Sequence, residues 1–312
     1  MSIQDYHIAK ELVYILIGVF SVLTICSIAF SLMHKRNPSD SNKELVLRTR
    51  SWWFIALGLC LVILAPPIFG TILIAYISFV ALREMFSISG MRESDRVAMF
   101  VAYFAIPIQY YLAYKMYFTQ FLAFIPLGMF MLISFVLVMG GNTAKIGRSM
   151  PLIPTLLMLT TYMLSHIVLL FNVEVSDFEV GAGGLIFYLV AITSFNDVFQ
   201  FVWGKALGKR KILPTVSPNK TWAGFVGGVL TTAVFSYCIR FLTPLADWEA
   251  LVTGLILGVM GFFGDSLVSA VKRDLQLKDT DDLIPGHGGA MDRLDSILIT
   301  APVFFHLLTF FT

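Results

Sequence analysis

Charged residues are scarce in this 312-residue chain, at 13%, against the roughly 25% usual for a globular domain in water. Hydrophobic residues make up 57%, and no polar block is long enough to fold alone. This composition excludes a soluble protein. It favours an all-α fold: one polytopic membrane bundle of about ten transmembrane helices, since helices satisfy their own backbone hydrogen bonds in lipid.

Cysteine is also nearly absent, and net charge is small. Cys26, Cys60 and Cys238 all lie in apolar stretches, without the paired spacing of a disulfide framework or a zinc site. A net charge of +2 gives no bulk attraction for nucleic acid. The first apolar run is too long for a signal-peptide core, so we expect it to remain as a helix.

Long apolar runs are what the sequence does contain. A span needs about 20 apolar residues, because the hydrocarbon core is ~30 Å thick and a helix rises about 1.5 Å per residue. Pro66 and Pro67 divide one long run into two helices of a tight hairpin. The predicted spans are 12–33, 52–66, 68–86, 97–114, 120–139, 151–171, 184–203, 225–242, 250–271 and 294–311.

The distribution of cations predicts the orientation. With the N-terminus outside, all but Lys10, Lys115 and Arg240 of the 22 Lys and Arg residues fall in inside loops. Cationic loops stay cytoplasmic, so we expect an integral membrane protein whose active site faces the cytoplasm, in the inner or plasma membrane if the source is bacterial. We predict a single membrane domain over 1–312, with lipid-embedding helices in 1–183 and a catalytic half in 184–312.

Asp197 lies inside the seventh predicted span, about 9 Å from the cytoplasmic end at Trp203. A carboxylate in the membrane costs at least ~2.5 kcal/mol unless it is paired or hydrated. It indicates either a functional site or a polar contact between helices.

The loop 204–224 gathers cations and hydroxyls. Ser217, Lys220 and Thr221 form a turn that suits phosphate, because an ammonium group and hydroxyl donors can bind one anion. The cluster Lys209–Lys211 has a plainer interpretation as an anchor to anionic headgroups.

Asp265, Ser269 and Lys272 follow the spacing i, i+4, i+7. They therefore share one face of the ninth predicted helix, with Asp265 about 10 Å deeper than Lys272. This face carries a carboxylate, a hydroxyl and an ammonium group.

Asp292 and Asp295 begin the last predicted helix, after a Gly-rich segment at 285–289. Folding this segment back could bring Asp265 and Asp292 together, and two carboxylates without counter-ions of their own would favour Mg²⁺. The helix dipole alone could explain acids in a first turn, and His287 alone is more often a loop hydrogen bonder.

At these residues the sequence resembles the CDP-diacylglycerol synthase (phosphatidate cytidylyltransferase) family. The positions that match its C-terminal signature are Ser269, Lys272, Arg273, Lys278, Asp279, Pro285, His287, Gly288, Gly289, Asp292, Arg293 and Asp295. Ser217–Trp222 with Gly224, and Asp197 before Gly204–Lys205, are similar to two further segments of the family. The chain departs from the family pattern at Gln200, Asp281 and Ala290.

The resemblance implies transfer of the CMP group of CTP to phosphatidic acid, giving CDP-diacylglycerol and pyrophosphate for phospholipid synthesis. It implies Mg²⁺ as cofactor, held by Asp265 and Asp292 with Asp295 or Asp197 in support. The implied catalytic residues are Asp265, Asp292, Lys272, Arg273 and His287. The implied substrate contacts are Asp197, Ser217, Lys220, Thr221, Ser269, Lys278, Asp279, Gly288, Gly289 and Arg293. The expected partners are CTP, phosphatidic acid and membrane lipids, with a second copy of the chain as a candidate and no nucleic acid.

Three other readings stay open at this point. The buried acids could serve a transporter or flippase, although we find no internal repeat of the kind common in transporters. The enzyme could use another lipid phosphate. A paralogue could retain the motif without activity.

Overall fold

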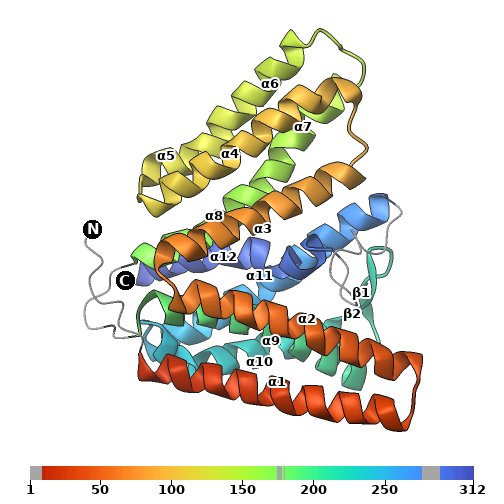
Figure 1. Cartoon of the computed structure of the whole chain (residues 1–312), viewed down its shortest axis with the longest axis vertical. Helices are drawn as coiled ribbons and strands as arrows, with labels where there is room; N and C mark the ends of the chain where they lie inside the picture. Colours follow the sequence, from red (N-terminus) through yellow and green to blue (C-terminus); the bar gives the residue numbers. More distant parts are fainter. Residues whose placement is uncertain (1–8, 174–177, 179, 276–288) are drawn as a thin grey trace.

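A bundle of long helices makes up the molecule (Figure 1). The computed structural model describes residues 9–173, 178, 180–275 and 289–312. Its elements are α1 (Lys10–Arg36), α2 (Asp40–Leu64), α3 (Pro67–Ile88), η1 (Glu93–Asp95), α4 (Arg96–Tyr114), α5 (Phe118–Ala123), η2 (Phe124–Met129), α6 (Phe130–Met139), α7 (Ile146–Leu157), η3 (Met158–Tyr162), α8 (Met163–Leu169), η4 (Leu170–Asn172), α9 (Gly181–Leu207), β1 (Lys211–Leu213), β2 (Ser217–Thr221), α10 (Trp222–Cys238), η5 (Arg240–Leu242), α11 (Asp247–Asp274) and α12 (Met291–Phe311).

The predicted all-α membrane bundle is confirmed. Within the described ranges, nine helical segments are long and apolar enough to cross a membrane. The eighth predicted span, 225–242, corresponds to α10, which ends at Cys238 and has 17 residues. At about 1.5 Å per residue it is about 25 Å long, shorter than the ~30 Å hydrocarbon core.

The proline pair at Pro66–Pro67 separates α2 from α3 as expected. Pro67 is the first residue of α3, where its missing N–H costs no helical hydrogen bond. α2 begins earlier than predicted, at Asp40, because Ser39 caps it by accepting the N–H of Asn42 at 3.2 Å. The charged segment before residue 52 is therefore part of a helix.

The C-terminal helices pack together around the candidate site. α10 contacts both α9 and α11, and α12 contacts α11, α9 and α8. In the 204–224 loop, β1 and β2 form an antiparallel hairpin, with Lys211 opposite Thr221 and Leu213 opposite Ser217. The hairpin lies at the right-hand end of the bundle in Figure 1, as do the α1–α2 and α3–α4 connections.

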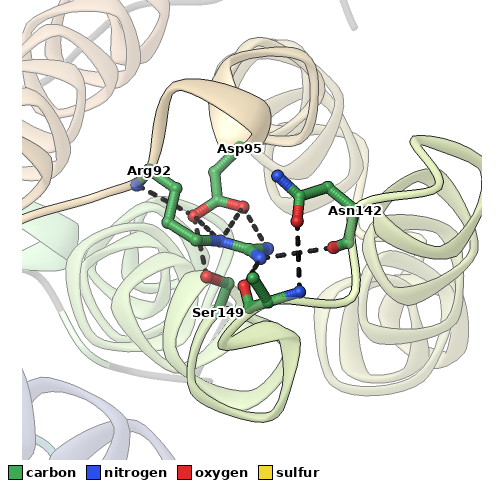
Figure 2. Close-up of polar contacts among 5 residues, drawn as sticks. Arg92, Asp95, Asn142 and Ser149 are labelled. Atoms are coloured by element: carbon green, nitrogen blue, oxygen red, sulfur yellow. Dashed lines mark hydrogen bonds and ion pairs between the residues drawn. The ribbon is translucent and has the colours of Figure 1, made fainter.

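A buried ion pair joins the α3–α4 connection to the α6–α7 connection (Figure 2). The guanidinium of Arg92 donates to the carboxylate of Asp95, with Nη2 2.6 Å from Oδ1, and the Asp95 side chain is fully buried. Ser149 Oγ donates to the same carboxylate at 2.7 Å. Arg92 also donates to the carbonyl oxygens of Asn142 and Ala144. One salt bridge thus fixes the 140–145 connection against η1.

We predict that Asp95→Asn lowers the free energy of unfolding by about 3 kcal/mol, because it leaves the largely buried Arg92 without its counter-charge. The measurement is the thermal unfolding midpoint of the purified protein in detergent. The matched control is Glu93→Gln, since Glu93 pairs with Arg96 in an ion pair with both side chains exposed, worth at most about 1 kcal/mol. Equal midpoints for the two variants would contradict this role for Asp95.

Candidate active site

Two lysine–aspartate ion pairs link three elements at one end of the bundle. Lys220 of β2 lies with Nζ 2.9 Å from Asp265 Oδ2 of α11, and Lys272 of α11 with Nζ 2.7 Å from Asp292 Oδ1 of α12. The expectation that these carboxylates lack counter-ions is therefore wrong. The antiparallel hairpin brings Lys220 to α11, a contact that the spacing of residues could not reveal.

Further contacts hold Lys220 in place. Its ammonium group donates to Ser266 Oγ at 2.8 Å and to the carbonyl oxygen of Phe262 at 3.2 Å. The same group lies 4.3 Å from the centroid of the Phe262 ring, a cation–π distance. With 13% of its side chain exposed, Lys220 is a largely desolvated cation held beside an acid.

The predicted face of α11 is confirmed. Ser269 Oγ donates to Asp265 Oδ1 at 3.1 Å, one turn along the helix. Lys272 follows on the same side and reaches α12. Asp265 therefore receives an ammonium group on one oxygen and a hydroxyl on the other.

Other residues of the hairpin brace the site. Thr221 is buried and its hydroxyl accepts the N–H of Gly224 at 3.1 Å, which caps α10. Arg273 Nε donates to the carbonyl oxygen of Val216 at 3.2 Å, which ties the hairpin to the end of α11. Ser217 opens β2 opposite Leu213. Substrate contacts by these residues stay predictions.

Asp197 and Asp295 complete a group of acids from three helices. Ser296 Oγ donates to Asp197 at 3.2 Å and 3.4 Å from its two oxygens, which links α9 to α12. Asp197 lies close enough to Asp295, Asp265 and Lys220 to interact with their charges. The residue is accessible at the surface of the described bundle, so a ligand can reach Asp197.

α11 and α12 approach closely at Gly264. A side chain there would overlap the backbone carbonyl of Asp295, so the glycine permits the contact. This approach places Asp265, the next residue, close enough to Asp295 for the two carboxyl groups to influence each other electrostatically.

The types of side chain at this site suit Mg²⁺, but their present positions do not. Carboxylate oxygens are the ligands that Mg²⁺ prefers. In the part of the chain that the structure describes, however, no three acidic, His or Cys side chains converge closely enough to hold a metal ion as they stand. Asp265 and Asp292 each form an ion pair with a lysine.

Part of the predicted site lies outside the described residues, namely Lys278, Asp279, Asp281, His287 and Gly288. Gly289 is described, and its backbone N–H donates to Asp292 Oδ2 at 3.1 Å. Arg293 is exposed in the first turn of α12.

Glu84 is a residue of the site that the sequence analysis missed. This buried acid of α3 accepts the N–H of Ala290 at 2.7 Å and the N–H of Met291 at 3.2 Å, at the N-terminus of α12. A carboxylate there binds free N–H groups and complements the helix dipole. The rule that drew attention to Asp197, an acid inside an apolar stretch, applies equally to Glu84 in the predicted span 68–86.

A sequence profile of the cytidylyltransferase family matches residues 46–311, most of the chain. The chain belongs to the cytidylyltransferase family. This membership makes it a nucleotidyltransferase by class and an integral membrane protein, and it favours the enzyme over the transporter.

Individual relatives refine this result. The uncharacterized protein YnbB of Escherichia coli (strain K12) is 36% identical over 293 residues, covering 94% of this chain and 96% of the relative. A phosphatidate cytidylyltransferase of Chlamydia muridarum is 40% identical over 128 residues, and one of Bacillus subtilis is 39% identical over 129 residues. These last two matches cover 39% and 41% of this chain, and 42% and 48% of the relatives. The chain thus matches less than half the length of either phosphatidate enzyme.

In this member of the cytidylyltransferase family, we predict that Glu84→Leu lowers both thermal stability and turnover. Two N–H groups at the start of α12 lose a charged acceptor, and such hydrogen bonds contribute about 1.5–3 kcal/mol each. Asp292 follows directly, so its ion pair with Lys272 would shift. Thermal unfolding and the rate of CTP-dependent pyrophosphate release measure the two effects.

The matched control for Glu84 is Glu249→Leu. Glu249 accepts the N–H of Ala246 at 2.8 Å at the start of α11, an exposed contact at the other end of that helix from Lys272. It should cost stability without changing turnover. A Glu84→Leu protein with unchanged stability and rate would refute the capping role.

Proposed function

We propose that the protein transfers the CMP group of CTP to phosphatidic acid, giving CDP-diacylglycerol and pyrophosphate. The observation that carries the proposal is the pair of partly buried lysine–aspartate contacts where β2, α11 and α12 meet. Family membership and the named phosphatidate cytidylyltransferases among its relatives support the same reaction.

The reaction joins two polyanions. An oxygen of the lipid phosphate attacks the α-phosphorus of CTP and forms a new P–O bond. The bond from that phosphorus to the bridging oxygen of the β-phosphate breaks, and the electron pair leaves with pyrophosphate. No general base is required, because a phosphate monoester is already an anion at neutral pH. The main requirement is neutralisation of negative charge.

Lys220 and Lys272 suit that requirement. Each ammonium group is positioned by an acid and partly shielded from water, so its interaction with phosphate is stronger than at an open surface. Arg273, Arg293, Lys278 and His287 are proposed as further phosphate contacts. Ser217, Thr221, Ser269, Gly288 and Gly289 are proposed as hydroxyl and backbone donors.

We propose Mg²⁺ as the cofactor, with Asp265, Asp292 and Asp295 as its ligands and Asp197 in support. The ion would supply positive charge to the triphosphate. For Asp265 and Asp292 to serve, Lys220 and Lys272 must turn from these acids to the phosphates, an exchange that leaves neither lysine without an anionic partner.

The proposed location is the cytoplasmic side of the membrane. The cationic connections and the hairpin lie at the same end of the bundle, and cationic loops stay inside. A diacyl lipid stays in the bilayer, because each CH₂ withdrawn from it costs ~0.8 kcal/mol. CTP must therefore come to the lipid from the water.

The first test of the proposal is pyrophosphate release by purified protein with CTP, Mg²⁺ and phosphatidic acid, each omitted in turn. We expect release only when all three are present. Release of pyrophosphate with another lipid phosphate but not with phosphatidic acid would mean that phosphatidic acid is not the substrate. If a folded sample releases no pyrophosphate with any lipid phosphate, the proposed cytidylyltransferase activity is contradicted.

We further predict that Asp265→Asn and Asp292→Asn each reduce turnover to background while the proteins still insert and purify. Each variant removes a carboxylate and leaves a lysine without its partner. The matched control is Asp247→Asn, which changes an exposed acid at the opposite end of α11. Near-normal activity of either site variant would exclude that residue from the catalytic machinery.

A further inference from the structure

A single stripe of α12 connects the acids to a pocket within the membrane-spanning region. Asp295, Ile299, Pro302 and His306 follow the spacing i, i+4, i+7, i+11, which places them on one face of the helix. All four are at least partly accessible. The face that packs into the bundle is fully buried and includes Leu298, Ala301, Phe304, Phe305 and Leu308.

The pocket lies between α12 and the segment formed by η3 and α8, which are in contact. Its volume is about 460 Å³. Its lining is mainly apolar and includes Tyr162, His166, Ile299, Pro302, Val303 and His306.

Both walls of the pocket contain an irregular helix. η3 is a π-helical turn that ends at Tyr162, and such turns are frequent at functional sites. Pro302 has no N–H to donate to the carbonyl of Leu298, and its ring prevents regular packing of the preceding turn. These interruptions disturb the local packing of two helices that are otherwise in contact, which accounts for the pocket.

The depth of the pocket matches one lipid leaflet. At about 1.5 Å per residue, the pocket begins about 6 Å along α12 from Asp295, at Ile299, and reaches about 16 Å at His306. Half of the ~30 Å hydrocarbon core is about 15 Å. A lipid whose phosphate is bound by Lys220 and Lys272, beside these acids, would therefore place a hydrocarbon chain along this stripe.

His166 and His306 line the deep part of the pocket. Their ring centroids lie 5.5 Å apart, and His166 is completely buried behind Phe121, Tyr162 and Phe305. A chain that follows the stripe meets these rings at His306.

We propose that this groove binds one hydrocarbon chain of the lipid substrate, and that His306 with His166 limits the length of chain that fits. The inference rests on the proposed function, because it places the lipid phosphate at the candidate active site. It adds where the chain lies and which residues select its length.

The first experiment uses the unaltered protein and phosphatidic acid that carries a photoreactive diazirine at the end of one chain. After illumination in lipid vesicles, mass spectrometry locates the label. We expect labelling of peptides that contain Tyr162–His166 or Val303–Leu307. Labelling spread over the outer surfaces of α1 and α6 instead would overturn the proposal.

The second experiment compares Val303→Trp with the wild type on dihexanoyl and dioleoyl phosphatidic acid. The indole would fill the middle of the groove, about 12 Å along α12 from Asp295. We expect kcat/KM for the dioleoyl lipid, divided by that for the dihexanoyl lipid, to fall at least about tenfold, equivalent to about two methylene groups withdrawn from the groove.

Phe310→Trp is the matched control, because Phe310 lies on α12 beyond the pocket with 81% of its surface exposed. It should leave the ratio unchanged. If Val303→Trp also leaves it unchanged, the groove does not hold the chain. If the wild type transfers CMP to neither lipid, the proposed function fails instead, so the two failures are distinguishable.

Discussion

The start of α12 is the point on which the candidate site depends. Glu84 binds the first N–H groups of this helix from α3, and Lys272 binds Asp292 in its first turn from α11. An acid buried in a membrane protein is costly unless its oxygens are satisfied, so Glu84 stabilises the fold only with α12 in this position. The N-terminal and C-terminal halves are therefore joined at the place where the chemistry is proposed.

The need to pair buried charges also explains how a helical bundle can hold lysines and acids together. α11 offers Asp265 and Lys272 two turns apart, and each reaches a different partner, Lys220 on the hairpin and Asp292 on α12. Both pairs are formed in the structure, and the proposed function requires both to exchange partners when a polyanion binds. Arg92 and Asp95 form a third pair, but the buried Asp95 carboxylate also binds Ser149, and their role is to join two connections.

Much of this site could be predicted from the sequence, because helical spacing is a local property. The face shared by Asp265 and Ser269 follows from the i, i+4 rule, and the break between α2 and α3 follows from Pro66 and Pro67. The contacts of Lys220 and Glu84 could not be predicted in this way. They depend on a hairpin and on a partner more than 200 residues away, and both are set by tertiary packing. The expectation that Asp265 and Asp292 lack counter-ions was wrong for the same reason.

We propose that the candidate active site transfers a nucleotide to a lipid. The most direct test follows a label from the nucleotide into the lipid. Purified protein in vesicles of phosphatidic acid would receive Mg²⁺ and CTP labelled at the α-phosphate, and the organic phase would be analysed for labelled lipid. We expect one molecule of labelled CDP-lipid for each molecule of pyrophosphate released. Label that remains entirely in the aqueous phase, with a folded protein, would contradict it.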